Sequence, residues 1–487
     1  MGGTTETTDA TETTSATGAT DTPAPGDLAA RAARRDGDDP LAAVRDRFAL
    51  DDGVTYLDGN SLGALPRSVP GRMAEVIERE WGELRIRSWE ESGWWTAPER
   101  IGDRIAPLIG AAPGQVVVGD STSVNVFKAV VAAVRAAQAA GSGAGADAGA
   151  AGDAGADGDA RAEGDAGAEG DAGAAGGAAR AGAGAAVGAG AGAGAGESGT
   201  GAVPRDEVLV DAATFPTDGY VAESAARLTG CRIRAVAPGD MAAAFGPRTA
   251  VALVNHVDYR SGRLHDLPGI TAAAHAAGAL VVWDLCHSAG ALPVELDAHR
   301  ADFAVGCTYK YLNGGPGAPA YLYVRRDLQP GFDSPLPGWN SHADPFGMES
   351  AYTPADGSVR GRVGTPDILS MLALEEALTV WEGVSVEAVR EKSLALTDFF
   401  LECVAHHVPP GTVESVSPAA HPERGSQIAL RCPDAGAVMR ELTRRGVVGD
   451  FRRPDVLRFG FTPLYTSFAD AERAARILGD VLAERRA

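Results

Sequence analysis

The amino-acid sequence predicts an α/β fold, in which a large domain with a mostly parallel sheet of the seven-stranded type lies between helices and a smaller α+β domain follows. Two observations support this prediction. Through the middle of the chain, nearly continuous apolar runs alternate with helical stretches, a pattern typical of parallel strands covered on both faces. After about residue 366 the pattern changes to a long helical region and shorter strands. The 487 residues are enough for two domains.

Hydrophobic periodicity places the individual elements. The N-terminal part is expected to hold a helix over 40–50, a strand at 54–57 that runs into a Gly/Asn turn, and an amphipathic helix over 68–83. The large domain has strand-like runs at 116–118, 207–211, 232–236, 249–257, 279–285, 303–309 and 318–324, with helices at 124–138, 218–229 and 268–278. The last third is expected to form a helix over about 366–405, strands near 412–417, 426–432 and 456–462, and helices near 435–446 and 468–485.

Two stretches have the composition of disordered chain. Residues 1–39 are rich in Thr, Ala, Asp and Gly, and residues 139–202 consist almost entirely of Gly, Ala, Asp and Glu. Neither has enough large apolar side chains to offset the entropy lost when a backbone is ordered. We therefore expect a disordered tail at 1–39, a large domain over 40–365 with a disordered insert at 139–202, and a small domain over 366–487.

Charge and cysteine use exclude several classes of protein. The formal net charge is −22 and the chain has no cluster of Lys and Arg, so nucleic acid and anionic membranes are not expected partners. No apolar run approaches the ~18 residues that span a membrane, and the N-terminus lacks the pattern of a secretory signal. The five cysteines are scattered without a CxxC pair, which favours free thiols in the cytoplasm over disulfides or a metal site.

Polar residues close some of the predicted strands. In an open α/β sheet, ligands bind where the carboxyl ends of the strands meet. Asp284 closes the apolar run 280–283, where an acid is costly unless it has a partner. Its carboxylate could hold a pyridine nitrogen protonated, whereas a helix cap or an internal ion pair is the ordinary alternative. His287 could equally be a core histidine whose hydrogen bonds are satisfied.

Lys310 is the strongest single candidate. Only three lysines occur among the 43 basic residues, and an amine is the one property that arginine cannot supply. Lys310 ends the run 303–309 and precedes a Gly-rich segment that lets backbone approach a ligand closely. We expect burial to lower the pKa of Lys310 and to make its amine nucleophilic. A surface lysine at a turn is the alternative.

Other features fit a ligand site but have ordinary explanations when taken singly. Thr122–Ser123 lies at a strand–turn–helix junction suited to a phosphate, or simply caps the helix. Phe215 and Asp218 could bind a planar ring, or form another cap. Arg458 stands in an apolar strand, where its partner is either a substrate carboxylate or a buried acid. Trp89 belongs to a Trp-rich segment that packs in the core or walls a pocket for an aromatic ligand.

Five segments together resemble the kynureninase family, which consists of fold-type-I enzymes that use pyridoxal 5′-phosphate (PLP). The resemblance covers essentially all of residues 40–487 apart from the insert. Its segments are Tyr56–Gly63, Phe215–Asp218, Tyr259–Gly262, Asp284–His287 and Tyr309–Asn313. It implies a hydrolase that cleaves L-kynurenine to anthranilate and L-alanine in tryptophan catabolism, and a homodimer with shared active sites. Trp89 resembles the bacterial form, which prefers kynurenine over 3-hydroxykynurenine.

The resemblance also implies residue roles. Lys310 would bond to the cofactor, Asp284 would pair with its ring nitrogen, and Tyr309 would carry protons. The implied cofactor-binding residues are Thr122, Ser123, Phe215, Asp218, Asn255, Asp284, His287, Tyr309, Lys310, Trp339 and Thr365. The implied substrate-binding residues are Arg458 for the α-carboxylate, Trp89 for the aromatic amine, and Asn60. Two positions depart from the family pattern, Asn255 where Ser is expected and Thr365 where some members have Asn.

Two rival functions remain at this point. A cysteine desulfurase or an aminotransferase of the same fold type is the alternative enzyme. A desulfurase needs an exposed cysteine on a mobile loop, whereas Cys286 and Cys307 are expected on strand ends beside Lys310. A binding or scaffold protein that recruits partners through the insert is the alternative outside enzymes, and it leaves Lys310 and Asp284 unexplained.

Overall fold

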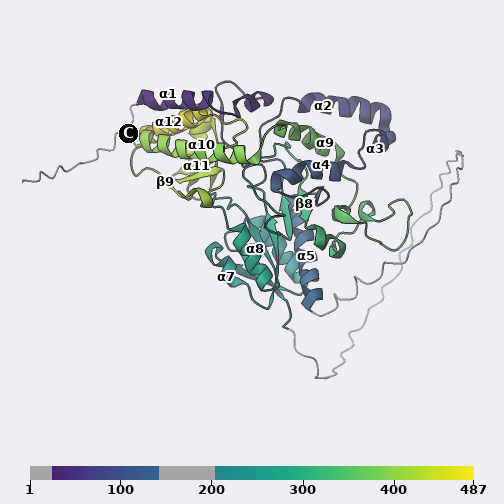
Figure 1. Cartoon of the computed structure of the whole chain (residues 1–487). Coiled ribbons are helices and arrows are strands. Elements are labelled where there is room, and N and C mark those ends of the chain that lie inside the picture. Colours follow the sequence, from purple (N-terminus) through teal and green to yellow (C-terminus); the bar gives the residue numbers. More distant parts are fainter. Residues whose placement is uncertain (1–24, 142–202, 487) are drawn as a thin grey trace, which may run out of the picture. The chain divides into compact units, whose positions relative to one another are not determined.

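The computed structural model describes residues 25–141 and 203–486 (Figure 1). Residues 25–138 and 204–486 belong to one compact unit. Most of the predicted disordered insert, residues 142–202, and the first 24 residues of the predicted tail lie outside the described residues. Within the described ranges, no helix is both long and apolar enough to cross a lipid bilayer.

A seven-stranded sheet is the centre of the large domain, as predicted. Its strand order is β2-β8-β7-β6-β5-β3-β4, and β8 alone is antiparallel to its neighbours, so the carboxyl ends of the other six strands meet at one edge. The strands are β2 (Val116–Val118), β3 (Glu207–Asp211), β4 (Arg232–Val236), β5 (Thr249–Asn255), β6 (Leu280–Asp284), β7 (Phe303–Gly306) and β8 (Tyr321–Val324).

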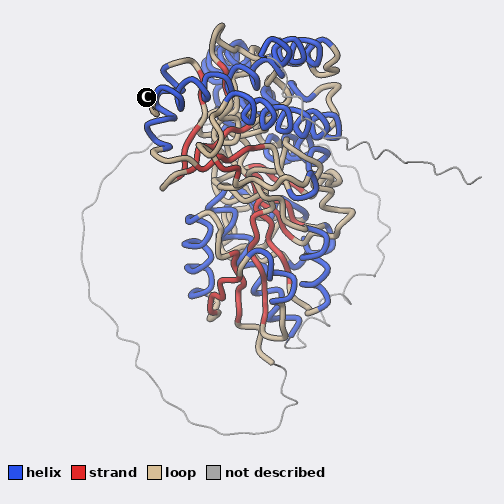
Figure 2. Tube along the Cα trace, turned by 90° about the vertical axis from the view of Figure 1, so that its left-hand side faces the viewer, coloured by secondary structure: helices blue, strands red, loops and turns tan. Residues whose placement is uncertain are grey.

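Helices cover both faces of this sheet, and Figure 2 shows them on either side of its strands. All seven residues of β5 are buried, because alternate side chains enter the cores on opposite faces. Val251 and Leu253 pack in one apolar cluster with α5 (Thr122–Gly141) and α6 (Pro216–Leu228). Ala252 and Val254 pack in another with α4 (Ala97–Ile105), α8 (Leu267–Ala276) and α9 (Ile368–Ala377).

The small domain is an antiparallel four-stranded sheet with helices, in the order β12-β13-β10-β9. Its elements are α10 (Val386–His407), β9 (Glu414–Ser415), β10 (Gln427–Arg431), α11 (Ala435–Arg444), β12 (Asp450–Arg452), β13 (Val456–Gly460) and α12 (Phe468–Glu484). The strand β12 and the short β11 (Val447–Val448) were not predicted, because two or three residues are too few to display an alternation.

The N-terminal segment is part of this small domain. Helix α1 (Pro25–Gly37) packs against α12, and its Leu28 and Ala32 lie in the same apolar cluster as the small-domain helices. Strand β1 (Thr55–Tyr56) pairs in parallel with β11. The prediction of disorder over 1–39 is therefore wrong for residues 25–39. Two apolar side chains on one face, Leu28 and Ala32, are enough to hold this helix in place because α12 offers them a surface to pack against.

The remaining helices differ from the predictions in length. The expected helix over 68–83 begins as α2 (Val69–Glu75) and continues as a π-helix over Val76–Leu84, and the expected helix over 366–405 is two helices separated by a turn at Gly383. Further short helices are α3 (Ser88–Glu91), α7 (Met241–Ala244) and the 3₁₀ turns Ala42–Arg47, Arg85–Arg87, Ala106–Ile109, Pro238–Asp240, Arg326–Gly331, Trp339–Ser341, Gly357–Gly361, Leu378–Trp381 and His421–Glu423.

Candidate active site

Polar side chains from four neighbouring strands meet at one edge of the sheet. Asn255 is the last residue of β5 and Asp284 the last of β6, and the two are paired across these strands. Lys310 follows β7, and the segment after β3 brings Phe215 and Asp218 to the same edge. The sequence placed Asp284 and Lys310 at strand ends but expected Asn255 inside a strand over 249–257, and the parallel topology brings these residues together.

The amide of Asn255 joins two carboxyl groups. Its Nδ2 donates to Oδ2 of Asp284 at 2.6 Å and to Oδ2 of Asp218 at 3.0 Å, and its Oδ1 accepts from the Thr214 hydroxyl. Burial and the neighbouring Asp284 carboxylate raise the pKa of Asp218 well above its ordinary value. Two carboxylates in contact cannot both stay ionised in a buried site. Asp218 is therefore the member of the pair that binds a proton more readily.

The Lys310 amine lies 3.3 Å from Nε2 of His287. Burial and the Lys310 charge lower the pKa of His287 well below its ordinary value, so the ring is neutral and can accept this hydrogen bond. The expectation of a lowered lysine pKa is wrong. Burial does lower the pKa of Lys310, but the adjacent Cys307 and Cys286 thiols and the Asp284 carboxylate raise it more, and the net shift is upward. Cys307 belongs to the lysine's own segment, whereas Cys286 and Asp284 come from the end of the neighbouring strand.

Gly63 fixes the loop that carries Lys310. Its backbone N–H donates to the carbonyl of Tyr309 at 2.7 Å. A Cβ atom at this position would lie 2.4 Å from the Lys310 carbonyl oxygen and 2.4 Å from Oδ1 of Asn313. Real Cβ atoms do not approach other atoms so closely, so only glycine lets the N-terminal turn dock against the lysine segment.

Gly63→Ala is expected to displace this segment. Such overpacking costs about 1–3 kcal/mol of stability, and the shift of the Lys310 backbone should weaken cofactor binding as well. Thermal unfolding and a titration of the protein with PLP would measure the two effects. Gly71→Ala is the matched control, because a Cβ there meets nothing within 4 Å. Equal behaviour of the two variants would contradict the assigned role of Gly63.

The N-terminus of α5 lies beside the same strand ends. Thr122–Ser123 begins this 20-residue helix, and the hydroxyl of Thr122 lies 3.9 Å from Sγ of Cys286. The free N–H groups of a helix N-terminus form a site for an anion such as a phosphate. The preceding Asp120 has a positive φ of 56° and is held by the buried Lys128, whose Nζ donates to Oδ2 of Asp120 at 2.7 Å.

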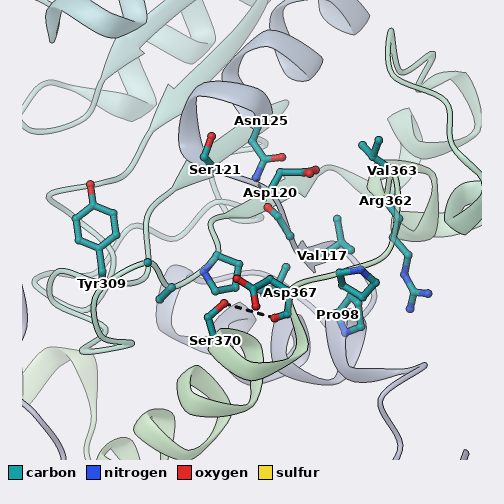
Figure 3. A pocket seen from close by; sticks show the side chains of 18 of the residues that line it. Pro98, Val117, Asp120, Ser121, Asn125, Tyr309, Arg362, Val363, Asp367 and Ser370 are labelled. Carbon is teal, nitrogen blue, oxygen red and sulfur yellow. Dashed lines mark hydrogen bonds between the residues drawn. The ribbon is translucent and has the colours of Figure 1, made fainter. Parts of the chain in front are cut away.

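A cavity of about 700 Å³ adjoins this turn. It is lined on one side by Tyr309 and Ser121 and on another by Arg362 and Val363 (Figure 3). Thr365 also lines it. The structure thus brings two of the predicted cofactor-contact residues, Tyr309 and Thr365, to one cavity next to the helix N-terminus.

The two predicted tryptophans lie together, but in another cavity. Trp89 and Trp339 line a space of about 890 Å³ with Trp95 and Phe346. The ring centroids of Trp95 and Trp339 are 5.7 Å apart, and Trp339 is 41% exposed. Among the described residues, this cavity has no lining residue in common with the cavity at Tyr309. Within one chain, Trp89 and Trp339 therefore line a different cavity from Tyr309.

Arg458 has an acid partner, the alternative that the sequence left open, although this partner is only partly buried. Its Nε donates to Oδ1 of Asp450 at 2.8 Å, and a second bond joins its terminal nitrogen to the other carboxylate oxygen. The guanidinium also donates to the Tyr259 carbonyl at 2.6 Å and to Oγ of Ser61 at 2.9 Å. Asp450 and Arg458 are direct partners across β12 and β13, so this pair is built into the hairpin.

Two other predicted residues differ in exposure. Phe215 is 43% exposed and packs edge-on against Tyr259, with 5.2 Å between ring centroids. It therefore has ring surface available for a flat ligand. Asn60 is fully buried, and its Nδ2 donates to Oε1 of Gln427 at 3.1 Å. This contact ties the N-terminal turn to β10 and gives Asn60 a structural partner.

A pH effect is expected from Asp58. Burial and the nearby Asp450 carboxylate raise the pKa of Asp58 to about 6, although Arg458 acts in the opposite direction. The folded protein thus binds the Asp58 proton more tightly than the unfolded chain does. The stability from this group is fully present below about pH 4 and is lost as pH rises through about 6.

Asparagine carries no charge at any pH, so the Asp58→Asn variant should be more stable than the parent protein above about pH 6. The difference in free energy of unfolding between the two proteins should grow between about pH 4 and pH 7. Thermal unfolding of both proteins across this range measures it. Asp52→Asn, at an exposed position, removes a charge outside the cluster and controls for net charge. An advantage that does not change with pH would contradict the raised pKa.

The chemistry of these groups suits PLP. That cofactor needs an amine for its aldehyde, a carboxylate for its ring nitrogen, N–H donors for its phosphate and a flat apolar face for its ring. Lys310 offers the amine, Asp284 the buried anion, the α5 N-terminus the N–H donors and Phe215 the exposed ring. The residues present therefore fit the cofactor.

Known proteins resemble the chain over nearly its full length. It is 44% identical to a kynureninase of Deinococcus radiodurans over 455 residues, which cover 92% of this chain and 95% of the relative. The chain belongs to the kynureninase family. A kynureninase of Burkholderia pseudomallei is 41% identical over 450 residues, covering 92% of this chain and 94% of that relative. A family model described as the kynureninase C-terminal domain matches residues 389–478.

Solved structures agree on the fold of this kynureninase family member. A cysteine desulfurase from Thermococcus onnurineus NA1 superposes with a TM-score of 0.66 at 16% identity, covering 91% of this chain and 98% of that one. The cystine C-S lyase C-DES, in complex with cysteine persulfide, superposes with a TM-score of 0.65 at 15% identity, covering 88% and 98%. These identities are low, so the likeness shows the fold alone, and it confirms the predicted fold-type-I architecture.

Some residues of the site were missed by the sequence reasoning. Asp450 was not singled out, although it stands eight residues before Arg458, a spacing that a tight hairpin can bring into register. Thr214, which completes the Asn255 hydrogen bonds, resembles any residue of a loop. Asp120 and Lys128 had a weak signal, since Lys128 is one of only three lysines.

Proposed function

We propose that this protein is a PLP-dependent kynureninase that hydrolyses L-kynurenine to anthranilate and L-alanine by cleaving the Cβ–Cγ bond. Its membership of the kynureninase family, over 92% of the chain, supports the reaction. The observation that carries the proposal is the position of Lys310 at the end of β7, with the Asp284 carboxylate at the end of the neighbouring strand.

PLP, when bound, supplies an aldehyde that holds the substrate amine and a ring that accepts negative charge from the substrate carbons. Lys310 holds the cofactor and then removes the proton from Cα of the substrate. The Asp284 carboxylate stabilises positive charge on the ring nitrogen, while the raised pKa of Asp218 makes that residue the preferred site for a proton within the pair. The neutral His287 orients the lysine amine through its ring nitrogen.

We propose further contacts for the predicted residues. Thr122 and Ser123, at the N-terminus of α5, bind the phosphate, and Phe215 stacks on the ring. Tyr309 moves a proton next to the lysine, and Asn255 keeps Asp284 in place. Thr365 and Trp339 complete the cofactor site, together with Asp218 and His287.

Arg458 is proposed to bind the substrate α-carboxylate. Asp450 fixes the guanidinium and compensates part of its charge, and Arg452 adds a second cation, with its terminal nitrogen 2.9 Å from Oδ2 of Asp450. The carboxyl groups of Asp450 and Asp58 face these two guanidinium groups, and the fork of N–H donors on Arg458 is the feature that suits a carboxylate ligand. Asn60 supports this region through its bond to β10.

Trp89 is proposed to face the aromatic amine of the substrate and to favour L-kynurenine over 3-hydroxykynurenine. We expect kcat/KM for kynurenine to exceed that for the 3-hydroxy compound. Steady-state rates with both substrates test this, and Trp89→His, which adds a hydrogen-bonding ring, is expected to narrow the difference. Equal kcat/KM values in the parent protein would refute the preference.

A homodimer with shared active sites is proposed as the assembly. The exposed Trp339 and Phe346 line a cavity that has no lining residue in common with the Tyr309 cavity. In such a dimer, Trp339 and Trp89 of one subunit would contact the cofactor held by Lys310 of the other subunit. We also propose a role in tryptophan catabolism and a cytoplasmic location, which the five free cysteines favour. We also propose a large domain over 40–365 and a small domain over 366–487, with helix α1 and strand β1 of the N-terminal segment joined to the small domain.

The test is an absorbance spectrum of the purified protein, followed by addition of L-kynurenine. We expect a visible band of lysine-bound PLP and the appearance of anthranilate fluorescence. A band without anthranilate would overturn the kynureninase reaction but keep the cofactor site. No band after addition of PLP would overturn both.

A further inference from the structure

Two buried cysteines lie side by side at the candidate active site. Cys286 follows β6 and Cys307 follows β7, which are neighbouring parallel strands. The last register pair of these strands is Asp284 with Val305, and each cysteine stands two residues further along. The backbone N–H of Cys307 donates to Sγ of Cys286 at 3.3 Å, and Sγ of Cys307 lies 3.9 Å from the carbonyl of Cys286.

This arrangement suits a disulfide bond. Neighbouring strands lie about 4.8 Å apart, and bridged cysteines have Cα atoms about 4.4–6.8 Å apart. Sγ of Cys286 already points at the main chain of Cys307, and each sulfur contacts the other residue. Joining the two therefore requires rotation of the side chains and a small shift of the strand ends.

The two thiols differ in the way that disulfide formation needs. Burial raises the pKa of Cys307, but the hydrogen bond from Cys286 and the charge of Lys310 outweigh it, and the net shift is downward. The pKa of Cys286 is raised well above its ordinary value by its hydrogen bond to Cys307 and by burial. Cys307 is thus the sulfur of the pair that loses its proton and reacts with oxidants more readily, and Cys286 is the thiol that can resolve the product.

A bond between these sulfurs would disturb the site. The backbone N–H of Cys286 donates to Oδ1 of Asp284 at 2.7 Å, and its sulfur contacts the Thr122 hydroxyl. Cys307 stands three residues before Lys310 on the same segment. A shift of either cysteine therefore moves the anion, the lysine or the helix N-terminus that the proposed function uses.

We propose that Cys286 and Cys307 are a redox modification site, which hydroperoxides convert to a disulfide and thiol reductants restore. The Cys307 sulfur attacks hydrogen peroxide, an S–O bond forms as the O–O bond breaks, and one water leaves. The Cys286 sulfur then attacks the oxidised Cys307 sulfur, an S–S bond forms, the S–O bond breaks, and a second water leaves. In sum, two thiols lose two electrons and two protons to one peroxide. The disulfide does not depend on the proposed kynureninase activity, whereas its effect on turnover does.

Peptide mapping of the purified holoenzyme tests the disulfide directly. After treatment with hydrogen peroxide, alkylation and tryptic cleavage, Arg300 separates the two cysteines into peptides 264–300 and 301–310. We expect these peptides to appear joined, with a mass two hydrogens below their sum, and to separate again after reduction. Absence of the joined peptide, or oxidation to sulfinic and sulfonic acids in its place, would overturn the proposal.

Measurements of enzyme activity test whether the disulfide inactivates the protein. Turnover of L-kynurenine should fall at least tenfold in parallel with the joined peptide and return when dithiothreitol is added. In the Cys286→Ala variant, dithiothreitol should restore none of the activity that peroxide removes. The activity of each protein is compared with that of its own untreated sample. Cys231→Ala is the matched control, because Cys231 contacts Gln138, Arg205 and Thr229 instead of a cysteine. A joined peptide in a fully active enzyme would refute the switch, and so would reversible inactivation of Cys286→Ala.

Discussion

Lys310→Ala is expected to remove the visible band of bound PLP and to reduce turnover of L-kynurenine by at least about 10³-fold. The variant loses the covalent anchor of the cofactor and the base at Cα together. Alanine leaves neither an amine nor a charge beside His287, whose ring lies 3.3 Å from the lysine nitrogen in the parent protein. The absorbance spectrum and the steady-state rate measure the two losses separately.

Two control variants separate the amine from the charge. Lys310→Arg keeps a cation but cannot form the bond, and it should fail as Lys310→Ala does. Lys392→Arg keeps the cation that pairs with Asp39 at 2.7 Å in another part of the fold, and it should retain the band. Substantial turnover in Lys310→Arg would show that the charge, and not the amine, is what the reaction needs.

Asp284→Asn is expected to lower kcat by about 10²–10³-fold, the usual loss when one electrostatic group of an active site is removed. Asparagine has nearly the same shape as aspartate but cannot stabilise positive charge on the ring nitrogen. Because Phe215, Lys310 and the α5 N-terminus are untouched, PLP should still bind. The effect should therefore appear mainly in kcat, which steady-state kinetics at saturating substrate will measure.

Asp218→Asn is the matched partner of this variant. The pKa of Asp218 is raised well above its ordinary value, and asparagine resembles a protonated aspartate. We expect this variant to lose less than about tenfold in kcat, far less than Asp284→Asn. If Asp218→Asn lost as much activity as Asp284→Asn, the assignment of the proton within the pair would be wrong.

The central sheet and the strand ends were predictable because their signals are local. Each strand of a sheet covered on both faces is a short apolar run, and β5 is buried at every position. A polar residue that ends such a run stands out, as Asp284 does. The common direction of the strands then follows from their alternation with helices, and it places Asp284 and Lys310 at one edge.

The contacts that tune the site were not predictable, because each joins segments far apart in the sequence. Asn255 contacts Asp218 on α6 and Asp284 on β6, and none of these segments indicates the other two. The upward pKa shift of Lys310 depends on Cys286, which belongs to a different strand. The Asp450–Arg458 pair needs the register of a hairpin whose first strand has only three residues.

Helix α1 escaped prediction for a related reason. A prediction from composition considers only the apolar area that a segment could bury by itself, and residues 25–37 have few apolar side chains. In the structure this helix buries Leu28 and Ala32 against helices from the other end of the chain. The carboxylate of Asp36 accepts hydrogen bonds from the N–H groups of Phe468 and Ala469, at 2.7 and 3.0 Å, and so caps α12.

This contact between α1 and α12 has a consequence for the order in which the protein matures. The first described helix to leave the ribosome packs against the last one, more than 400 residues later in synthesis. The seven-stranded sheet, by contrast, is complete once Val324 has emerged, so it can collapse while the small domain still waits for its final helix. Arg458, on β13, enters a finished hydrophobic core only after α12 arrives. A nascent chain therefore has its cofactor lysine in place before the arginine proposed for the substrate, and premature termination would leave the lysine without that arginine.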